Sequence, residues 1–314
     1  GQGLANARRD CCKHRIMSSL LIITLLLSPG LGAPAADRAA FTLALAAARA
    51  DPAIPFDLEV DCTDGAERRS LEVMHGAVAV WNNSVQVRLS EKERTALIKV
   101  LTDANFSSFE ARYGDVRKTD KQEAPLRVSC QVRVEIDGKE KSSVQLFDGE
   151  QSDRLLDLAR ALVDVVEPGV DGGITATSIE DGLAKLAAGE LAPEVLKVRW
   201  LDLPGNGEEQ PGFIVRVRGG SIERQAYAPG SDVGEITSSE LTDSQLQTLI
   251  AAFEESQFWE LPLNLQADGL TEIQLSILAQ SKTVVARSSF RPAAMGKQAA
   301  FVRLQSRLME LRQR

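Results

Sequence analysis

The sequence predicts an α+β protein built from two repeated modules, each an antiparallel sheet packed against two helices. A segment that begins at Leu89-Ser90 recurs 152 residues later, without a gap, from Leu241-Thr242. Around both copies, strand-like and helix-like patterns follow in the same order and without strict β-α alternation, which favours an antiparallel sheet. We therefore expect modules at 36–167 and 196–314, joined by a linker at 168–195.

Each module is expected to begin with strands and a tight turn. Phe56, Leu58 and Val60 alternate with acidic residues, which is the period of a half-buried strand. His75-Gly76 then separates two apolar runs and predicts a hairpin. Gly219-Gly220 occupies the same place in the second module, and glycine adopts the positive φ of such turns without strain.

The helix that follows is the best-marked element of each module. Ser90 with Glu93, and Thr242 with Gln245, form capping boxes, in which two side chains satisfy free backbone amides at a helix start. Apolar residues then recur at helical spacing, so one face of each helix is expected to be buried. These residues are Leu97, Val100, Leu101 and Ala104 in the first copy and Leu249, Ala252 and Phe253 in the second.

A second hairpin and a closing helix complete each predicted module. Asp137-Gly138 is a strong two-residue turn signal between alternating apolar residues. The closing helices are expected over two stripes of identical spacing, Leu155, Leu158, Leu162, Val165 and Phe301, Leu304, Leu308, Leu311. The linker is rich in glycine, and we expect one short helix within it, from about Ile179 to Leu186.

Residues 1–35 have the pattern of an export signal. Four basic residues precede the apolar run Ile16 to Leu27, and small residues follow it, so cleavage is expected after Ala35 or Ala36. A membrane anchor is the alternative, but this run of twelve residues is shorter than the roughly 20 that cross a bilayer. We therefore predict a periplasmic or extracellular protein without a stable membrane span.

Removal of residues 1–35 takes away four basic residues and one acidic residue, so the net charge falls from −8 to −11. This charge disfavours nucleic acid and anionic membranes as partners. Cys62 and Cys130 are the only cysteines that remain, and an even pair in an oxidising compartment predicts one disulfide, confined to the first module.

The run from Leu241-Thr242 to Leu261-Pro262, with Asp268, Ile273 to Ile277 and Lys282-Thr283-Val284, resembles the emfourin family. Emfourins are small bacterial inhibitors of thermolysin-type metallopeptidases. The run also resembles neighbouring bacterial families of unknown function. The resemblance covers about 100 residues in each copy and rests on core and turn positions. It implies the fold and makes a metallopeptidase a possible partner, but it transfers no binding residues.

Residues suited to catalysis are few. His75 is the only histidine of the mature chain, and we interpret it as a turn residue and predict no catalytic residue, no cofactor and no metal site. Acidic residues gather at Asp61, Asp64 and Glu67 and at Asp115 and Asp120, where they could hydrolyse a glycoside or hold Ca²⁺, although solvated turns are the commoner explanation.

The candidate binding residues are Gln257, Phe258, Trp259 and Glu260. Phe258 and Trp259 are adjacent at a helix end, so their rings face different ways and one could be exposed. Trp81 and Trp200 could add to an aromatic platform, although most aromatic residues pack in cores.

Three hypotheses follow for the function. The first is an exported, non-enzymatic protein-binding protein, with a peptidase as the named partner. The second is an envelope or scaffold protein of the same fold, and the third is a carboxylate-based hydrolase.

Overall fold

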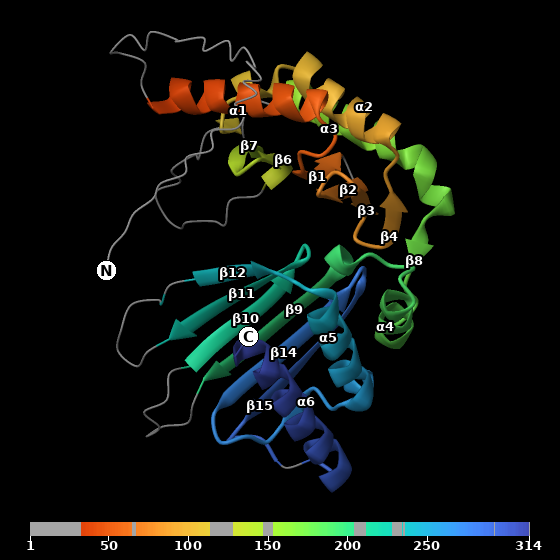
Figure 1. Ribbon diagram of the computed structural model, residues 1–314, viewed down its shortest axis with the longest axis vertical. Coiled ribbons are helices and arrows are strands. Elements are labelled where there is room, and N and C mark those ends of the chain that lie inside the picture. Colours follow the sequence, from red (N-terminus) through yellow and green to blue (C-terminus); the bar gives the residue numbers. More distant parts are fainter. Residues whose placement is uncertain are drawn as a thin grey trace, which may run out of the picture.

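The structure is a computed structural model, which describes residues 33–64, 67–113, 128–146, 153–203, 212–227, 234, 236–291 and 293–313. Two sheets carry the fold, each with its helices on one face, which confirms the predicted α+β class (Figure 1). Most of the predicted export signal, residues 1–32, lies outside the described residues, and the expected cleavage point falls in the first turn of a helix that starts at Ala33.

The first sheet has the strand order β5-β7-β6-β1-β2-β3-β4-β8. Its strands are β1 (Phe56–Asp64), β2 (Glu67–Met74), β3 (Val78–Trp81), β4 (Val85–Arg88), β5 (Arg112–Tyr113), β6 (Val128–Ile136), β7 (Lys139–Leu146) and β8 (Ile174–Thr175). Neighbouring strands are antiparallel except for the short edge pair β5 and β7, which is parallel. The sheet is therefore mixed at its edge, where a purely antiparallel sheet was expected.

Three helices cover the first sheet, where two were expected. They are α1 (Ala33–Ala50), α2 (Glu91–Asp103) and α3 (Asp153–Val166). The additional helix is α1, which buries Phe41, Leu45 and Ala48 in the core. These three residues have helical spacing, but they lie in an alanine-rich stretch in which the apolar stripe has little contrast. We call this sheet and its three helices the first module.

The second sheet has the order β12-β11-β10-β9-β14-β15-β13. Its strands are β9 (Leu196–Leu203), β10 (Gly212–Arg218), β11 (Ser221–Tyr227), β12 (Ile236–Glu240), β13 (Asn264–Leu265), β14 (Leu270–Ile277) and β15 (Gln280–Arg287). Its helices are α4 (Ile179–Ala187), α5 (Asp243–Glu255) and α6 (Met295–Gln313). We call this sheet and these helices the second module.

The strand orders of the two sheets correspond position by position, except that the first sheet has an additional edge strand, β8. β1 and β9 are the central strands, each flanked on one side by a hairpin partner (β2 or β10) and on the other by β6 or β14. Both predicted capping boxes are present, at Ser90 with Glu93 and at Thr242 with Gln245. A residue in the left-handed conformation follows each capped helix, Asn105 (φ 53°) and Gln257 (φ 47°). The two modules thus share their topology and their local turns.

The expected linker 168–195 contains regular structure. Its first part forms the 3₁₀ helix η2 (Glu167–Gly172) and then β8, which pairs with β4 of the first sheet. The expected short helix is α4, which packs against β14 and β15. A Cβ atom on Gly182 of α4 would lie 2.8 Å from Ile277 Cγ2, so glycine is what allows this close approach. A second 3₁₀ turn, η3 (Pro193–Val195), leads into β9.

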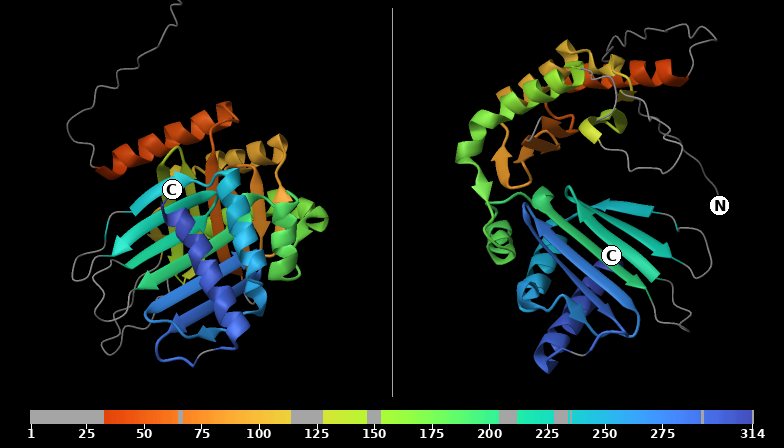
Figure 2. Two further views of the ribbon diagram at one scale, coloured as in Figure 1. Left: turned by 60° about the horizontal axis from the view of Figure 1, so that its bottom comes forward. Right: turned by 180° about the vertical axis from the view of Figure 1, so that it is seen from behind.

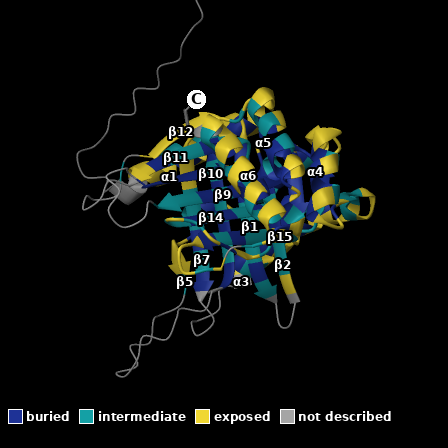
Figure 3. Cartoon of the chain, turned by 90° about the horizontal axis from the view of Figure 1, so that it is seen from below, coloured by how far each residue is buried: buried dark blue, intermediate teal, exposed yellow. Residues whose placement is uncertain are grey.

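The two modules contact each other through the first sheet. Its helices lie on one face, and the second module lies against the opposite face (Figures 1 and 2). Met74, Val78 and Val80 of β2 and β3 are buried in the hydrophobic core of the second module rather than in that of the first. Exposed residues lie along the outer sides of α5 and α6, and buried strands lie beneath these helices (Figure 3). Among the described residues, no helix combines the length and apolar character required to cross a bilayer.

Candidate functional site

The four candidate binding residues do not form a projecting loop. They form the 3₁₀ turn η4 (Phe258–Glu260), which begins after Gln257. Phe258 is fully buried, with its ring 5.1 Å from that of Phe253, and Trp259 packs partly against the same core. Gln257 and Glu260 are exposed, and Glu260 Oε2 lies 2.6 Å from Lys297 Nζ.

A partly buried lysine holds this turn through its backbone. Lys282 Nζ donates a hydrogen bond of 2.6 Å to the carbonyl oxygen of Trp259. Burial lowers the pKa of Lys282, Lys297 lowers it further, and Glu260 acts in the opposite direction. The first module has a related contact, in which Lys141 Nζ donates at 2.6 Å to the carbonyl oxygen of Phe109, the residue that follows the turn η1 (Phe106–Ser108). The contacts of Phe258 and Trp259 therefore stabilise the fold of the second module.

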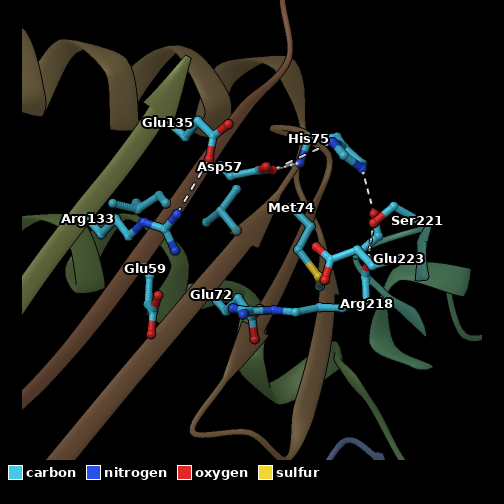
Figure 4. A pocket seen from close by; sticks show the side chains of 13 residues that line it. Asp57, Glu59, Glu72, Met74, His75, Arg133, Glu135, Arg218, Ser221 and Glu223 are labelled. Carbon is cyan, nitrogen blue, oxygen red and sulfur yellow. Dashed lines mark hydrogen bonds and ion pairs between the residues drawn. The ribbon is translucent and has the colours of Figure 1, made fainter. Parts of the chain in front are cut away.

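The structure shows a second candidate site, a cleft of about 330 Å³ between the modules. We call it the inter-module cleft. Its lining includes Asp57, Glu59, Glu72, Met74, His75, Arg133, Glu135, Arg218, Gly219, Ser221 and Glu223 (Figure 4). Five of these residues are acidic and two are arginines, so carboxylates dominate the charge of the cleft.

The wall from the first module follows from strand alternation. Phe56, Leu58 and Val60 of β1 are buried against the helices, as predicted, so Asp57 and Glu59 point to the opposite face of the sheet. The strand register then places carboxylates directly opposite one another. Asp57 is opposite Glu135 on β6, and Glu59 is opposite Glu72 on β2. Like charges in directly opposed positions destabilise a sheet.

Cations relieve part of this repulsion. Arg133 on β6 is directly opposite Glu59, and its guanidinium forms ion pairs with Glu135 at 3.6 Å and with Glu140 at 3.0 Å. These carboxylates raise the pKa of Arg133, chiefly through the hydrogen bond that Arg133 donates to Glu140, while burial opposes the shift. Glu59 itself forms no ion pair or hydrogen bond through its side chain with any described residue.

The wall from the second module is the end of the β10–β11 hairpin and the start of β11. Ile222 is buried in the core, so its neighbours Ser221 and Glu223 point to the open face of the second sheet. Glu223 lies within the cleft, and its carboxylate has no ion-pair partner among the described residues.

Direct contacts hold the two walls together. His75, in the predicted turn with φ 54°, has its Nε2 atom 3.0 Å from the carbonyl oxygen of Gly219, in the corresponding turn of the second module. The His75 amide donates to Asp57 Oδ1 at 2.6 Å, which fixes the turn. Glu72 is the main electrostatic link, because its Oε2 lies 2.6 Å from Lys197 Nζ and its Oε1 lies 3.7 Å from Arg218 Nη2.

The other predicted site residues lie apart from the cleft or outside the described chain. Asp61 forms a two-pronged ion pair with Arg68, its cross-strand neighbour. Asp64 and Glu67 oppose each other at the end of the β1–β2 hairpin. Asp115 and Asp120 lie outside the described residues. In the part of the chain that the structure describes, no three His, Cys, Asp or Glu residues are grouped so that they could hold a metal ion.

Cys62 and Cys130 form the predicted disulfide, with their sulfur atoms 1.98 Å apart. They join the central strand β1 to β6 within the core of the first module. Trp200 is buried, with its ring edge against Phe213, and Trp81 and Trp259 pack against different cores, so the three tryptophans do not form one platform.

The sequence indicates which strand residues are exposed, but it does not predict that residues of both modules line one cleft. The alternation that buries Leu58 also predicts that Asp57 and Glu59 are exposed, and the register of the β1–β2 hairpin, in which Asp64 pairs with Glu67, brings Glu59 opposite Glu72. The placement of the second module over this face depends on Met74, Val78 and Val80, which carry no distinguishing pattern.

Comparison with known proteins gives no assignment. No protein-family model matches the chain, and no curated protein matches it significantly.

Proposed function

We propose that this protein is an exported, non-enzymatic binding protein, and that its inter-module cleft receives a segment of a protein partner. The observation that carries the proposal is the register of the first sheet, which sets Asp57 opposite Glu135 and Glu59 opposite Glu72 on an open face. Such pairs destabilise the free protein, and a cationic partner would relieve their repulsion.

The ion pairs across the cleft support binding rather than catalysis. A carboxylic acid that transfers protons near neutral pH is usually placed in an apolar environment, which disfavours its charged form. Asp57 and Glu135 are half exposed, at 50% and 44% of the side chain, and both oxygens of Glu72 face cations of the second module. These groups are arranged to hold a charge.

The disulfide supports export. Disulfide bonds persist in the periplasm and outside the cell and are rare in a reducing cytosol. Cys62 and Cys130 are bonded in the core of the first module, where exchange with small thiols is restricted. The leader-like pattern of residues 1–35 indicates the same compartment.

The resemblance to emfourins makes a thermolysin-type metallopeptidase the first partner to test. An envelope or scaffold role would use the same fold without inhibition, and a carboxylate-based hydrolase is the third possibility. These alternatives differ in whether the protein inhibits a peptidase at a fixed molar ratio and in whether the protein itself hydrolyses a substrate. One set of assays distinguishes them.

The test is a titration of a thermolysin-type metallopeptidase with the mature protein, beside an assay of the protein alone on glycoside and ester substrates. We expect inhibition that saturates at a fixed molar ratio and no turnover by the protein alone. Hydrolysis that saturates with substrate and is lost on an Asp or Glu substitution would overturn the non-enzymatic proposal. Absence of any effect on the peptidase would leave the scaffold role and exclude this partner class.

Two variants locate the contact. Glu59→Gln with Glu223→Gln removes two cleft carboxylates that have no ion-pair partner, and Gln257→Ala removes an exposed side chain of the η4 turn. We expect the first variant to weaken inhibition several-fold and the second to leave it unchanged, with neither melting temperature below that of the parent. Weaker inhibition by Gln257→Ala, with unchanged inhibition by the double variant, would place the binding site at the η4 turn.

A further inference from the structure

Strand β12 is an open sheet edge beside the inter-module cleft. It pairs with β11 on one side only, and Ser238 is directly opposite Glu223, while Glu240 is opposite Ser221. Glu223 and Ser221 line the cleft. β12 is therefore the next strand outward from the cleft wall, and it lies on the side of the second sheet that faces the first module (Figures 1 and 2).

The edge is unusually accessible. All five residues of β12 are exposed, whereas the other edge strands of the described chain, β5, β8 and β13, have two residues each. Natural proteins protect an edge with lysine, proline, a bulge or a covering element. β12 ends in the charged residue Glu240, but it has no lysine, proline or bulge, no described element covers it, and Ile236 is 54% exposed.

We propose that β12 is the site at which an extended, basic segment of a partner protein adds as a further strand of the second sheet. The free N–H and C=O groups of β12 would supply main-chain hydrogen bonds, which do not depend on the partner's sequence. Glu240, together with Glu223 and Glu59 of the cleft, would select for lysine or arginine at alternate positions of that segment.

Charge decides between a partner segment and a second copy of this chain. The chain has a net charge of −8, and five carboxylates line the cleft beside β12 against two arginines. A second copy would bring a like-charged surface to this edge, whereas a basic segment brings the opposite charge. This inference rests on the proposed binding function, since it names the chemistry of the partner for the same cleft.

The experiment uses a blocked hexapeptide of alternating lysine and valine as the probe, added to the mature protein. Hydrogen exchange should show slower exchange of β12 amides, and calorimetry should show one peptide bound per chain. The same peptide with alternate backbone nitrogens methylated cannot complete the ladder and should bind about tenfold more weakly. Binding of both peptides with equal affinity would overturn strand addition.

Proline substitutions in β12 test strand addition by removing a backbone N–H of the protein instead of one of the peptide. Thr237→Pro and Ser238→Pro are both made, because successive N–H groups of an antiparallel strand point alternately to the partner strand and to the free edge. The variant that keeps the melting temperature of the parent has lost an outward N–H, and we expect it to bind the probe about tenfold more weakly. Unchanged affinity in that variant would contradict the proposal.

Charge variants and two further measurements complete the test. Glu240→Gln should weaken binding roughly threefold at low salt, whereas Glu254→Gln, on the exposed side of α5, should leave it unchanged. Concentration-dependent dimerisation with protection of β12 in the absence of peptide would assign the edge to a second copy and overturn the proposal. Cleavage of the probe, detected by mass spectrometry, would instead overturn the proposed non-enzymatic function.

Discussion

The two modules join equivalent pairs of neighbouring strands by different side-chain contacts. In the first module, Cys62 on β1 is opposite Cys130 on β6 and bonded to it. In the second, Asp202 on β9 is opposite Thr271 on β14, and the Thr271 hydroxyl donates a hydrogen bond of 2.7 Å to Asp202 Oδ1. Gln305 of α6 donates to the same hydroxyl at 3.1 Å.

These positions are equivalent by register. Leu58 pairs with Val73 and Val134, and Val198 pairs with Val217 and Leu275. The first turn begins two residues after Val73 and Val217, at His75 and Gly219. The second turn begins three residues after Val134 and Leu275, at Asp137 and Leu278. Counting four residues along the central strand reaches Cys62 in one module and Asp202 in the other.

The comparison teaches that the fold does not depend on the disulfide. The second module buries a core of similar composition and reaches the same topology with a polar contact at this position. The disulfide is therefore a local reinforcement of the first module, which also carries the charged face with opposed carboxylates. Four predictions sharpen this comparison, beginning with the largest expected effect.

Replacement of both cysteines, Cys62→Ala with Cys130→Ala, should lower the unfolding free energy of the first module by about 4 kcal/mol, as the chain-entropy model gives for a cross-link across 68 residues. Urea unfolding followed by Trp81 fluorescence reports on this module, and Trp200 reports on the second. Equal losses in both modules would show that they unfold as one unit and would contradict a local role.

Removal of the equivalent polar contact should cost less. Thr271→Val deletes a buried hydroxyl that bonds both Asp202 and Gln305, so we expect a loss of about 1–3 kcal/mol from the second module. Ser276→Ala, on the same strand but exposed, is the control and should stay within about 0.5 kcal/mol. Asp202→Cys with Thr271→Cys should form a disulfide under oxidising conditions, and two free thiols there would refute the equivalence.

The two capping boxes should contribute equally. Ser90→Ala and Thr242→Ala each remove the side chain that accepts the N3 amide of the helix, at a cost of about 1 kcal/mol to the module concerned. Urea unfolding of the two variants measures both values. A cost confined to one module would show that the corresponding helix start is held by tertiary packing instead.

The smallest expected effect is a difference in pH dependence. Hydrogen bonds from the Ser90 hydroxyl and amide lower the pKa of Glu93, whereas Gln245 does not titrate. The pKa is lowered in the folded state, so this stabilisation is present above the unfolded pKa of Glu93 and is lost as the pH falls through its folded value. Glu93→Gln should remove this part of the acid dependence, which develops as the pH falls below the ordinary glutamate pKa of about 4.3. An unchanged pH profile would show that Glu93 contributes nothing as an anion.

Local signals in the sequence predicted much of the fold. Capping boxes, two-residue turns and apolar stripes depend on neighbours within a few residues, and the structure confirms the α+β class built on them. The additional helix α1 escaped prediction because alanine separates its buried and exposed faces weakly. Gly76 combines the local turn signal with a tertiary constraint, since a Cβ atom there would lie 2.8 Å from the ring of Phe56 on β1.

The cleft could not be predicted because it depends on how the modules are placed. The sequence alone marks Glu72 only as a polar residue of a strand. In the structure, its Oε2 atom lies 2.6 Å from Nζ of Lys197, which is 125 positions later in the chain. The Phe258-Trp259 pair suggested an exposed aromatic surface, but the left-handed turn at Gln257 directs Phe258 into the core. Sequence patterns predict which face of a strand or helix is buried. Which of these faces contact one another depends on shape and charge over the whole chain.

The central claim is that both modules build one binding site for a basic segment. Backbone amide chemical shifts of the whole mature protein, followed during titration with the alternating lysine and valine hexapeptide, test it most directly. The account predicts shifts in both walls together, at Glu59 and Glu135 of the first module and at Ser221 and Ser238 of the second. Shifts confined to one module, or centred on Gln257 to Glu260, would contradict it.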